Sequence, residues 1–511
     1  MFFFVVLFAF CVVVVALRTM FVTSSPSFTR AARTTAARTF RTLRGQNTGA
    51  AGSTPSKWPV IVNREESSKD MQNATVLGQS SIPGSAPLSA RLRKSPFFES
   101  TLDAGVAEFT VYNRMLMPIG FNAGHEVEYK ALTEDAAMWD VAAERQVELK
   151  GPDAGKLAQL LTCRDVSNLD VGKCVYAIMT DGDGVVINDP VLLKLADDQY
   201  WFSIADSDIL LWAKGVATAQ MYDVKVTEPD VSPLAVQGPR SKEILSELYG
   251  EELVHSLKYF GFAHGEETNI PSMNKDGEPI PTLLARSGWS PEHGYEIYLK
   301  DGSRGSELWD IVANIGKKYN IKPGAPNQQR RIEAGMLSFG GDTLEDTNAL
   351  ELGLPKKFVD PFGTHDFIGK EALQKIASDG VKRTFVGLYF LDDVLDSGSY
   401  WRGQHLPMYG SPTANNDDDD KKSDLDLDQV GVITAYAHSP KFGCNLGVGY
   451  IDADIATAGT FVGVKTASGN MVAGRVSTLP FKMSSKIGGR KLSSKSLGNV
   501  TTVVNVSEKC T

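Results

Sequence analysis

The stretch SPLAVQGPRSKEILSELYG, residues 232 to 250, repeats a pattern that occurs first as RQVELKGPDAGKLAQLL at residues 145 to 161. Each copy begins as a short apolar strand, turns at a Gly-Pro pair and continues with the apolar spacing of an amphipathic helix. The repetition predicts two similar α+β units. After the first copy we expect three strands, joined by turns at 181–184 and 196–198.

After the second copy, PTLLARSG and GYEIYL are expected to form strands on either side of a loop, followed by a helix over residues 306–317. Beyond residue 382 the strand signals TFVGLYF, GVITAYA, NLGVGYI and FVGVKT recur with Gly-rich turns and little helix. They predict a small all-β C-terminal domain. The fold class expected for the whole chain is therefore α+β.

A chain of 511 residues is too long for one ordinary core. Composition divides it into five segments: a signal or transit segment at 1–44, a disordered linker at 45–94, a main folded domain at 95–380, the all-β domain at 381–482 and a flexible tail at 483–511. Within the folded part, the polar stretches 266–280 and 411–429 are expected to be surface insertions.

The N-terminal segment combines two targeting signals. Phe2 to Leu17 is an apolar run, too short for a comfortable membrane span, and it matches the core of a signal peptide better. It is followed by six arginines up to residue 44 with no Asp or Glu, which is the composition of an organelle transit segment. We expect an organellar protein, with the mitochondrion favoured if Met20 is the start, and a plastid or secretory route as the alternatives. The mature protein is not expected to be embedded in a membrane.

Charge and cysteine usage exclude several classes of function. Without residues 1–44 the chain carries 46 Lys and Arg against 61 Asp and Glu, a net charge of −15, which disfavours a nucleic-acid partner. The five cysteines show no paired spacing and no neighbouring histidine cluster, so we expect reduced thiols and no metal site. The usual signatures of phosphate cradling, zinc hydrolysis and serine hydrolysis are also missing from the sequence.

The loop and strand RSGWSPEHGYEIYL, residues 286 to 299, hold the first candidate site residues. The strand alternates, so Glu296 and Tyr298 share one face and apolar residues take the other. That face is either simply wet or part of a site. Trp289 stands in the turn, where a large aromatic side chain must pack on something or form the wall of a pocket.

Two further polar residues stand in unusual places. Asn188-Asp189-Pro190 interrupts an apolar strand that runs from 185 to 195, and proline confines this point to an edge or a bulge. Asp189 is therefore either a candidate for chemistry or a turn-capping residue. Arg331, in RRIEAG, is by itself best explained as a salt-bridging helix residue.

The order of elements, together with GWSPEHGYEIYL, RRIEAGMLSFGGD and DFIGKEAL, resembles the tetrahydrofolate-dependent aminomethyltransferase family, which includes the T-protein of glycine cleavage. The family loop runs Gly-Tyr-Thr-Gly-Glu-Asp-Gly-Phe-Glu-Ile; here Trp289 replaces the tyrosine and Glu296 keeps the glutamate. TVYNRMLMP, MWDVAAERQVELKG, LTCRDVSNLDVGKC, INDPVLLKL and WFSIADSDILLWAKG are similar to the branch that demethylates dimethylsulfoniopropionate. The likeness covers about residues 95 to 482.

The resemblance implies a folate-binding fold: two related α+β units and a C-terminal β-barrel around a central channel, with a homodimer as a possible assembly. It implies transfer of a methyl group from the sulfonium of dimethylsulfoniopropionate to N5 of tetrahydrofolate, giving methylmercaptopropionate and 5-methyltetrahydrofolate. The iron–sulfur assembly relative of the family is set aside, because its cysteine signature is missing from FIGKEAL.

Site roles follow from the same resemblance. On the side of tetrahydrofolate, Glu296 accepts hydrogen bonds from the pterin edge, Tyr298 contacts the same molecule, and Arg331 pairs with the glutamyl tail or with a structural carboxylate. Asp189 aligns with the catalytic aspartate near the folate nitrogens.

On the substrate side, Trp289 and then Tyr176 are the aromatic candidates for contact with the sulfonium, because an aromatic face attracts an onium centre. The Ser203 hydroxyl could hydrogen-bond the propionate group.

Two other functions stay open at this point. One is a related one-carbon transferase with an N-methyl or aminomethyl donor, as in glycine cleavage, against which the Trp289 substitution argues. The other is a folate-binding protein without catalysis. The 266–280 insertion lies shortly before the functional loop, where it could replace a wall of the substrate pocket.

Overall fold

The structure, a computed structural model, describes residues 92–273, 277–391, 400–401, 405–410, 428–466 and 468–482. The predictions for the targeting segment 1–44, for nearly all of the 45–94 linker, for most of the 411–429 insertion and for the tail lie outside these residues. The proposed domain boundaries therefore stay predictions.

Two sheets form the main domain. The first has six strands in the order β12-β13-β14-β11-β3-β15. Their bounds are β3 Ala137–Asp140, β11 Ser232–Gln237, β12 Phe262–His264, β13 Thr282–Ala285, β14 Gly294–Leu299 and β15 Lys322–Gly324. The second has five strands in the order β10-β4-β9-β8-β5. Their bounds are β4 Gln146–Lys150, β5 Lys173–Tyr176, β8 Val191–Ala196, β9 Gln199–Ser203 and β10 Lys225–Thr227.

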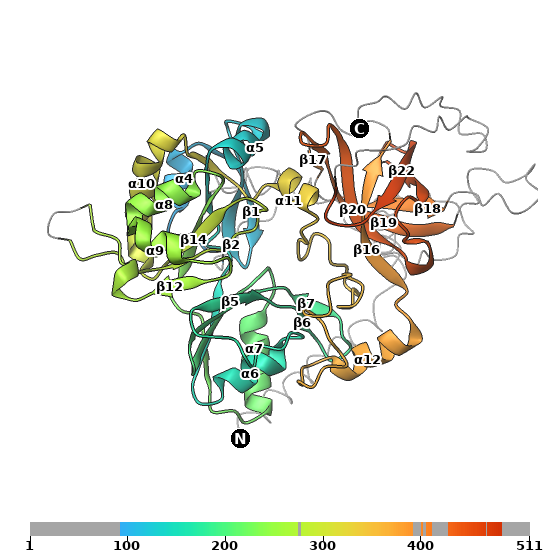
Figure 1. The fold of residues 1–511 in the computed structure, drawn as a ribbon, viewed down its shortest axis with the longest axis horizontal. Coiled ribbons are helices and arrows are strands. Elements are labelled where there is room, and N and C mark those ends of the chain that lie inside the picture. Colours follow the sequence, from blue (N-terminus) through green and yellow to red (C-terminus); the bar gives the residue numbers. More distant parts are fainter. Residues whose placement is uncertain are drawn as a thin grey trace, which may run out of the picture. The chain divides into compact units, whose positions relative to one another are not determined.

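Helices cover the outer face of each sheet, as Figure 1 shows for α8 and α10 on the first sheet and for α6 and α7 on the second. The helices of the main domain are α4 Phe98–Asp103, α5 His125–Glu134, α6 Ala154–Leu161, α7 Ile209–Ala219, α8 Ser241–Tyr249, α9 Glu251–Ser256, α10 Gly305–Gly316 and α11 Gln328–Ala334. In the ranges that the structure describes, no helix combines the length and the apolar character needed to cross a membrane.

The inner faces of the two sheets pack on each other through one apolar cluster. It takes side chains from β8 and β9 on one sheet and from β13 and β14 on the other: Leu193, Leu195, Trp201, Leu283, Ala285 and Tyr298. The rings of Trp201 and Tyr298 meet across it, with centroids 6.5 Å apart. The main domain is therefore layered as helices, sheet, sheet and helices.

The two predicted copies are confirmed as β4 followed by α6 and β11 followed by α8, and their turns make the same contacts. Both turn glycines have positive φ, +143° at Gly151 and +120° at Gly238, where a side chain would be strained. In each copy, the residue two positions after the turn glycine donates its backbone N–H to a carbonyl. The Asp153 N–H donates to the Asp223 carbonyl at 3.2 Å, and the Arg240 N–H donates to the Asp135 carbonyl at 2.8 Å. The sequence repeat is thus a structural repeat.

The copies also exchange a strand, which the sequence pattern did not predict. β3 directly precedes β4 in the chain but pairs with β11, and β10 directly precedes β11 but pairs with β4. The chain therefore crosses from one sheet to the other at 141–145 and again at 228–231.

Five strands, rather than the expected three, occupy residues 173–203. The polypeptide leaves the sheet after β5 to make a separate hairpin, β6 Met179–Thr180 and β7 Val186–Asn188, around the predicted 181–184 turn. It returns at Asp189-Pro190, so the strand expected over 185–195 is in fact two strands of different sheets, divided at the proline. β1 Val106–Tyr112 and β2 Met115–Phe121 form another hairpin.

The C-terminal domain is a closed barrel of six strands. The strands β16, β18, β19, β20, β21 and β22 are linked by successive pairings, and the β19–β20 pairing closes the circle. Their bounds are β16 Arg383–Phe390, β18 Leu406–Gly410, β19 Gln429–Ser439, β20 Cys444–Asp452, β21 Phe461–Lys465 and β22 Met471–Ser477, with β17 Tyr400–Trp401 beside β19 and α12 Lys370–Asp379 before the barrel. The fold class expected from the sequence is confirmed.

Candidate active site

Glu296 and Tyr298 share a buried face of β14, so the predicted alternation holds and the wet-face alternative does not. Glu296 is 5% exposed. Its Oε2 accepts hydrogen bonds from Ser287 Oγ at 2.5 Å and from the Tyr298 hydroxyl at 3.1 Å. Burial raises the pKa of Glu296, because a carboxylate loses its hydration there. Within the part of the chain that the structure describes, no donor reaches Oε1, which leaves one acceptor oxygen open.

Ser203 lies against Tyr298. The Tyr298 hydroxyl interacts with the Ser203 side chain, which also accepts a hydrogen bond from Gln146 Nε2 at 3.3 Å. The repeat explains this contact. Lys150 of the first copy pairs with Gln199 of β9, and the equivalent Gln237 of the second copy pairs with Gly294 of β14. Ser203 and Tyr298 each lie four residues after these partners. The two side chains occupy equivalent positions in the two copies.

Asp189 and Tyr176 form a second pair. Asp189 lies at the break between β7 and β8, and its Oδ2 accepts the Tyr176 hydroxyl at 2.9 Å. Burial raises the pKa of Asp189 to about 7, although the Tyr176 hydrogen bond opposes the shift. The Tyr176 ring packs edge-on against Phe358, with centroids 5.8 Å apart. Asp189 is therefore a carboxyl group poised to exchange a proton near neutral pH.

Trp289 and Arg331 form a third pair. Trp289 Nε1 donates to the Leu337 carbonyl at 3.1 Å, and Arg331 Cζ lies 5.8 Å from the centre of the indole ring. Arg331 is 2% exposed and forms an ion pair with Asp342. Of the two partners considered for Arg331, the structural carboxylate is the one found here. Its role toward the glutamyl tail stays a prediction.

Electrostatic influence links these pairs. Burial and then the charges of Glu296 and Asp189 raise the pKa of Glu144 well above its ordinary value. The charge of Asp342 contributes to the raised pKa of Asp189. Six of the seven predicted residues thus belong to contacting pairs that involve β5, β14, α11 and the loops beside the strands, and Ser203 of β9 joins the Tyr298 pair.

A pocket of about 290 Å³ opens beside this network. It is lined by residues 286–288, 290–294 and Tyr259. Ser287 lines the pocket and also donates to Glu296, so one hydrogen bond connects the pocket wall to that carboxylate. Asp189 and Tyr176 do not line it. His293 contacts Arg286 and Tyr295 through its two ring nitrogens at 3.2 and 3.1 Å.

Two family models match the chain. The GCVT N-terminal domain matches residues 98–360, and the glycine cleavage T-protein C-terminal barrel domain matches residues 401–482. The chain belongs to the glycine cleavage T-protein family. The resemblance noted in the sequence is confirmed by these matches.

Individual relatives within the T-protein family differ in their named activities. The chain is 35% identical over 381 residues to the dimethylsulfoniopropionate demethylase DmdA of Ruegeria pomeroyi, covering 75% of this chain and 95% of that protein. It is 28% identical over 395 residues to an aminomethyltransferase of Halothermothrix orenii, covering 76% of this chain and 100% of that protein. The crystal structure of aminomethyltransferase T from Bartonella henselae shares the fold, with a TM-score of 0.62, 20% identity, and coverage of 76% of this chain and 98% of that one.

The T-protein fold of this chain brings further residues to the site that the sequence interpretation did not mark. Ser287 donates a hydrogen bond to Glu296, and Gln146 donates one to Ser203. The charges of Glu296 and Asp189 contribute to the raised pKa of Glu144. Tyr112 also faces this region, since burial and then the charges of Glu144 and Asp189 raise its pKa. The sequence offered one signal for three of these residues. The segments TVYNRMLMP and MWDVAAERQVELKG, on which the resemblance rests, contain Tyr112, Glu144 and Gln146.

Proposed function

We propose that this chain is a tetrahydrofolate-dependent methyltransferase that demethylates dimethylsulfoniopropionate to methylmercaptopropionate. The observation that carries the proposal is a cluster of buried or partly buried acidic groups in the site without a basic partner among the described residues. Glu144, Asp189 and Glu296 are three carboxyl groups with raised pKa values, and no Lys or Arg of the described chain contributes to those shifts. A site rich in carboxylates and aromatic rings suits a cationic substrate such as a sulfonium.

The residues present fit tetrahydrofolate. Oε1 of Glu296 can accept from the N–H edge of a pterin, and Ser287 and Tyr298 hold the carboxylate in place through Oε2. When bound, tetrahydrofolate supplies the nucleophilic nitrogen N5 that receives the methyl group. Because a sulfonium leaves as a neutral thioether, the leaving group needs no acid. The protein contributes mainly orientation, which can be worth about 7–11 kcal/mol.

Asp189 can handle the one proton that the reaction releases. N5 of tetrahydrofolate carries a hydrogen that must leave once the nitrogen is methylated. A carboxyl group with a pKa of about 7 can accept it in the ionised form. The Tyr176 hydroxyl donates a hydrogen bond to Asp189 and so orients its carboxylate.

The test is a donor screen with product identification. The protein from about residue 92 onward is incubated with tetrahydrofolate and, in turn, with dimethylsulfoniopropionate, an N-methyl donor or the aminomethyl intermediate of glycine cleavage. We expect 5-methyltetrahydrofolate and methylmercaptopropionate from the first donor, without added metal.

The same screen tests the competing activity, aminomethyl transfer, which is the named activity of relatives at 25–29% identity. Formation of 5,10-methylenetetrahydrofolate from the aminomethyl donor, with no reaction of the sulfonium, would replace the proposal by an aminomethyltransferase. Folate binding with no turnover of any donor would indicate a binding protein.

For residues 1–44 we propose an organelle-targeting role, with the mitochondrion favoured, on the basis of the arginine-rich, acid-free composition. Fluorescent-protein fusions that begin at Met1 and at Met20 test it, since only the shorter leader is expected to give purely mitochondrial import. A homodimer is likewise proposed, and sedimentation of the purified protein measures it.

A further inference from the structure

Glu144 stands in the first crossover, on the turn between β3 and β4. Three consecutive carbonyls of this turn are held by side chains: Ala142 by Arg145 Nη1 at 3.2 Å, Ala143 by Asn113 Nδ2 at 3.0 Å and Glu144 by Gln146 Nε2 at 2.6 Å. The Glu144 N–H donates to the Val141 carbonyl at 2.9 Å. The backbone of Glu144 is therefore held firmly in place.

The carboxylate of Glu144, unlike its backbone, has no hydrogen-bond partner among the described residues. Across the described ranges, no hydrogen-bond donor and no Lys or Arg reaches it, whereas Glu296 and Asp189 each accept a tyrosine hydroxyl. A partly buried carboxylate without such a partner is costly and needs a reason.

The repeat shows that this position need not be acidic. Aligning Gly151 with Gly238 places Glu144 opposite Val231 of the second crossover. Val231 is 3% exposed and packs in the apolar cluster between the sheets. The two crossovers lie together, because Arg145 Nη1 donates to the Val231 carbonyl at 3.0 Å. The same turn thus carries an apolar residue in one copy and, in the other, an acid that no basic side chain of the described ranges reaches.

A second buried polar group beside Glu144 also lacks a partner. Gln146 is 0% exposed, and its Nε2 donates to the Glu144 carbonyl and to Ser203 Oγ. Its Oε1 is buried with no hydrogen-bond partner among the described residues. Gln146, two residues after Glu144, therefore keeps an unused acceptor while its Nε2 donates to Ser203, one of the predicted substrate residues.

We infer that the Glu144 carboxylate is the counter-charge of the sulfonium of the methyl donor, and that it selects the cationic substrate over the neutral thioether product. The inference rests on the proposed function. A cation close to Glu144 gains Coulomb attraction in a site of low dielectric. Transfer of the methyl group leaves a neutral thioether, so that attraction ends with the chemical step and favours product release.

The groups that face Glu144 add a pH signature. Glu296 and Asp189, together with Tyr298 and Tyr112, are the titratable groups that interact with it from the neighbouring strands and loops. Because the two acids favour the protonated form of Glu144, binding of a cation should release a proton from this cluster. Affinity for the cation should therefore rise with pH.

The experiment compares a charged ligand with its neutral counterpart. Titration calorimetry measures the binding of dimethylsulfoniopropionate and of methylmercaptopropionate to the wild-type protein and to Glu144→Gln. The expected result is that the variant binds the sulfonium at least tenfold more weakly, binds the thioether unchanged and releases fewer protons on sulfonium binding. Tetrahydrofolate affinity and circular dichroism report whether the variant is folded.

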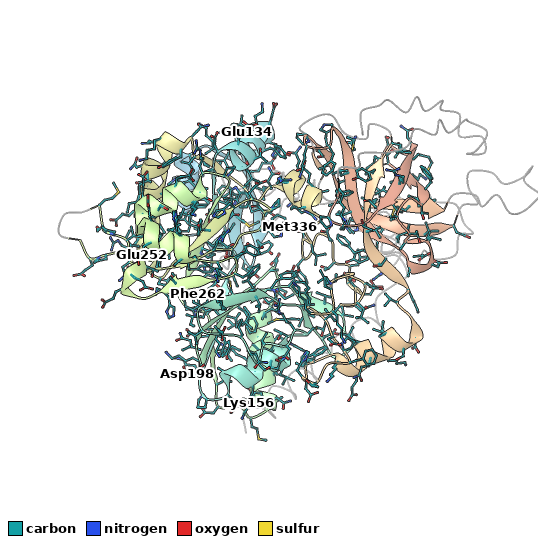
Figure 2. The ribbon with its side chains drawn as sticks, viewed as in Figure 1. Glu134, Lys156, Asp198, Glu252, Phe262 and Met336 are labelled. Carbon is teal, nitrogen blue, oxygen red and sulfur yellow. The ribbon has the colours of Figure 1, made fainter. Side chains whose placement is uncertain are left out.

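The matched control is Glu252→Gln on α9, a surface residue labelled in Figure 2, which removes the same charge far from the substrate residues along the sequence. It should leave both affinities unchanged. Equal weakening of sulfonium and thioether binding in Glu144→Gln, or no weakening of either, overturns the inference. If the wild type neither binds nor turns over the sulfonium, the proposed function itself fails, which is a distinct outcome.

Discussion

At the scale of single residues, Asp189 is the clearest case in which local sequence and environment act together. Pro190 ends the strand pairing, so Asp189 lies in the break between β7 and β8. The sequence pattern could indicate this break. The change in the pKa of Asp189 needs burial and the nearby Asp342, which come from other parts of the chain.

A pH-dependent stability follows for Asp189. Its pKa is about 7 in the folded protein against an ordinary value of 3.8, so the folded state binds the proton more tightly. The free energy of unfolding should therefore fall as pH rises from about 4 to about 7. Asp189→Asn removes that share of the slope while it keeps an acceptor for Tyr176. Urea unfolding at pH 5 and pH 8 measures it.

The control in that experiment is internal. Asp140, whose pKa burial raises to about 6, contributes a slope of the same sign in both proteins and cancels in the difference. A slope unchanged by Asp189→Asn would contradict the assignment.

A division of labour between Glu296 and Trp289 gives a second prediction. Glu296→Ala should weaken tetrahydrofolate binding by about 1.5–3 kcal/mol, the range for hydrogen bonds to a charged group. Trp289→Ala should mainly raise KM for the sulfonium, because the change removes an aromatic ring that can contact a cation, as it does with Arg331 in the structure. Binding titrations and steady-state kinetics check both, and equal losses of folate affinity in the two variants would refute the division.

At the scale of elements, the repeated strand–Gly-Pro–helix unit was visible in the sequence because strand and helix periods are local. Its detailed contacts were not. Glycine is required at both turns for two reasons: φ is positive, and the carbonyls of Asp223 and Asp135 lie where a side chain would begin, 2.6 Å from a Cβ at position 151 and 2.7 Å from one at 238.

The third prediction concerns these glycines. Gly151→Ala and Gly238→Ala should each lower the free energy of unfolding by about 1–3 kcal/mol, because the backbone is strained and an oxygen must move. Gly215→Ala is the matched control: it lies in α7 with open space around it, and should be neutral or stabilising by up to about 1 kcal/mol. Thermal unfolding of the three variants decides, and equal effects at all three positions would contradict the structural repeat.

The 266–280 insertion is an element whose place the sequence left open. Ile270 and Ile280 pair at its base, with hydrogen bonds of 2.9 and 2.7 Å, and both join the core under α10. Ser272 donates to Glu307 of α10 at 2.7 Å. The described residues of the insertion thus pack on the helix side of the first sheet, whereas Glu296 and Tyr298 face its other side.

At the scale of the whole molecule, α11 joins the main domain to the barrel through buried polar contacts. Arg331 pairs with Asp342, which accepts the Thr434 hydroxyl of β19 at 2.7 Å. Glu333 accepts the Ser439 hydroxyl at 2.5 Å and the Tyr129 hydroxyl of α5 at 3.0 Å. A short helix therefore holds strands of the barrel and a helix of the main domain.

The fourth prediction is that Arg331 acts first as a structural residue. Arg331→Ala should lower the free energy of unfolding by about 3–5 kcal/mol, because Asp342 is left as an uncompensated buried charge. Adding Asp342→Ala should recover part of that loss, as a double-mutant cycle by urea unfolding would show. If instead Arg331→Ala keeps its stability and loses tetrahydrofolate affinity, the glutamyl-tail role is the correct one.

The sequence by itself determined the main strands and helices of the repeat, the all-β end and the family, because strand and helix periods, glycine turns and the Trp289 to Glu296 motif are local. Tertiary structure alone decided the exchange of β3 and β10, the contact of Ser203 with Tyr298 and the raised pKa of Glu144. These depend on which distant segments pack together. Burial, which sets the pKa of a carboxyl group, is a property of that packing rather than of any short stretch of residues.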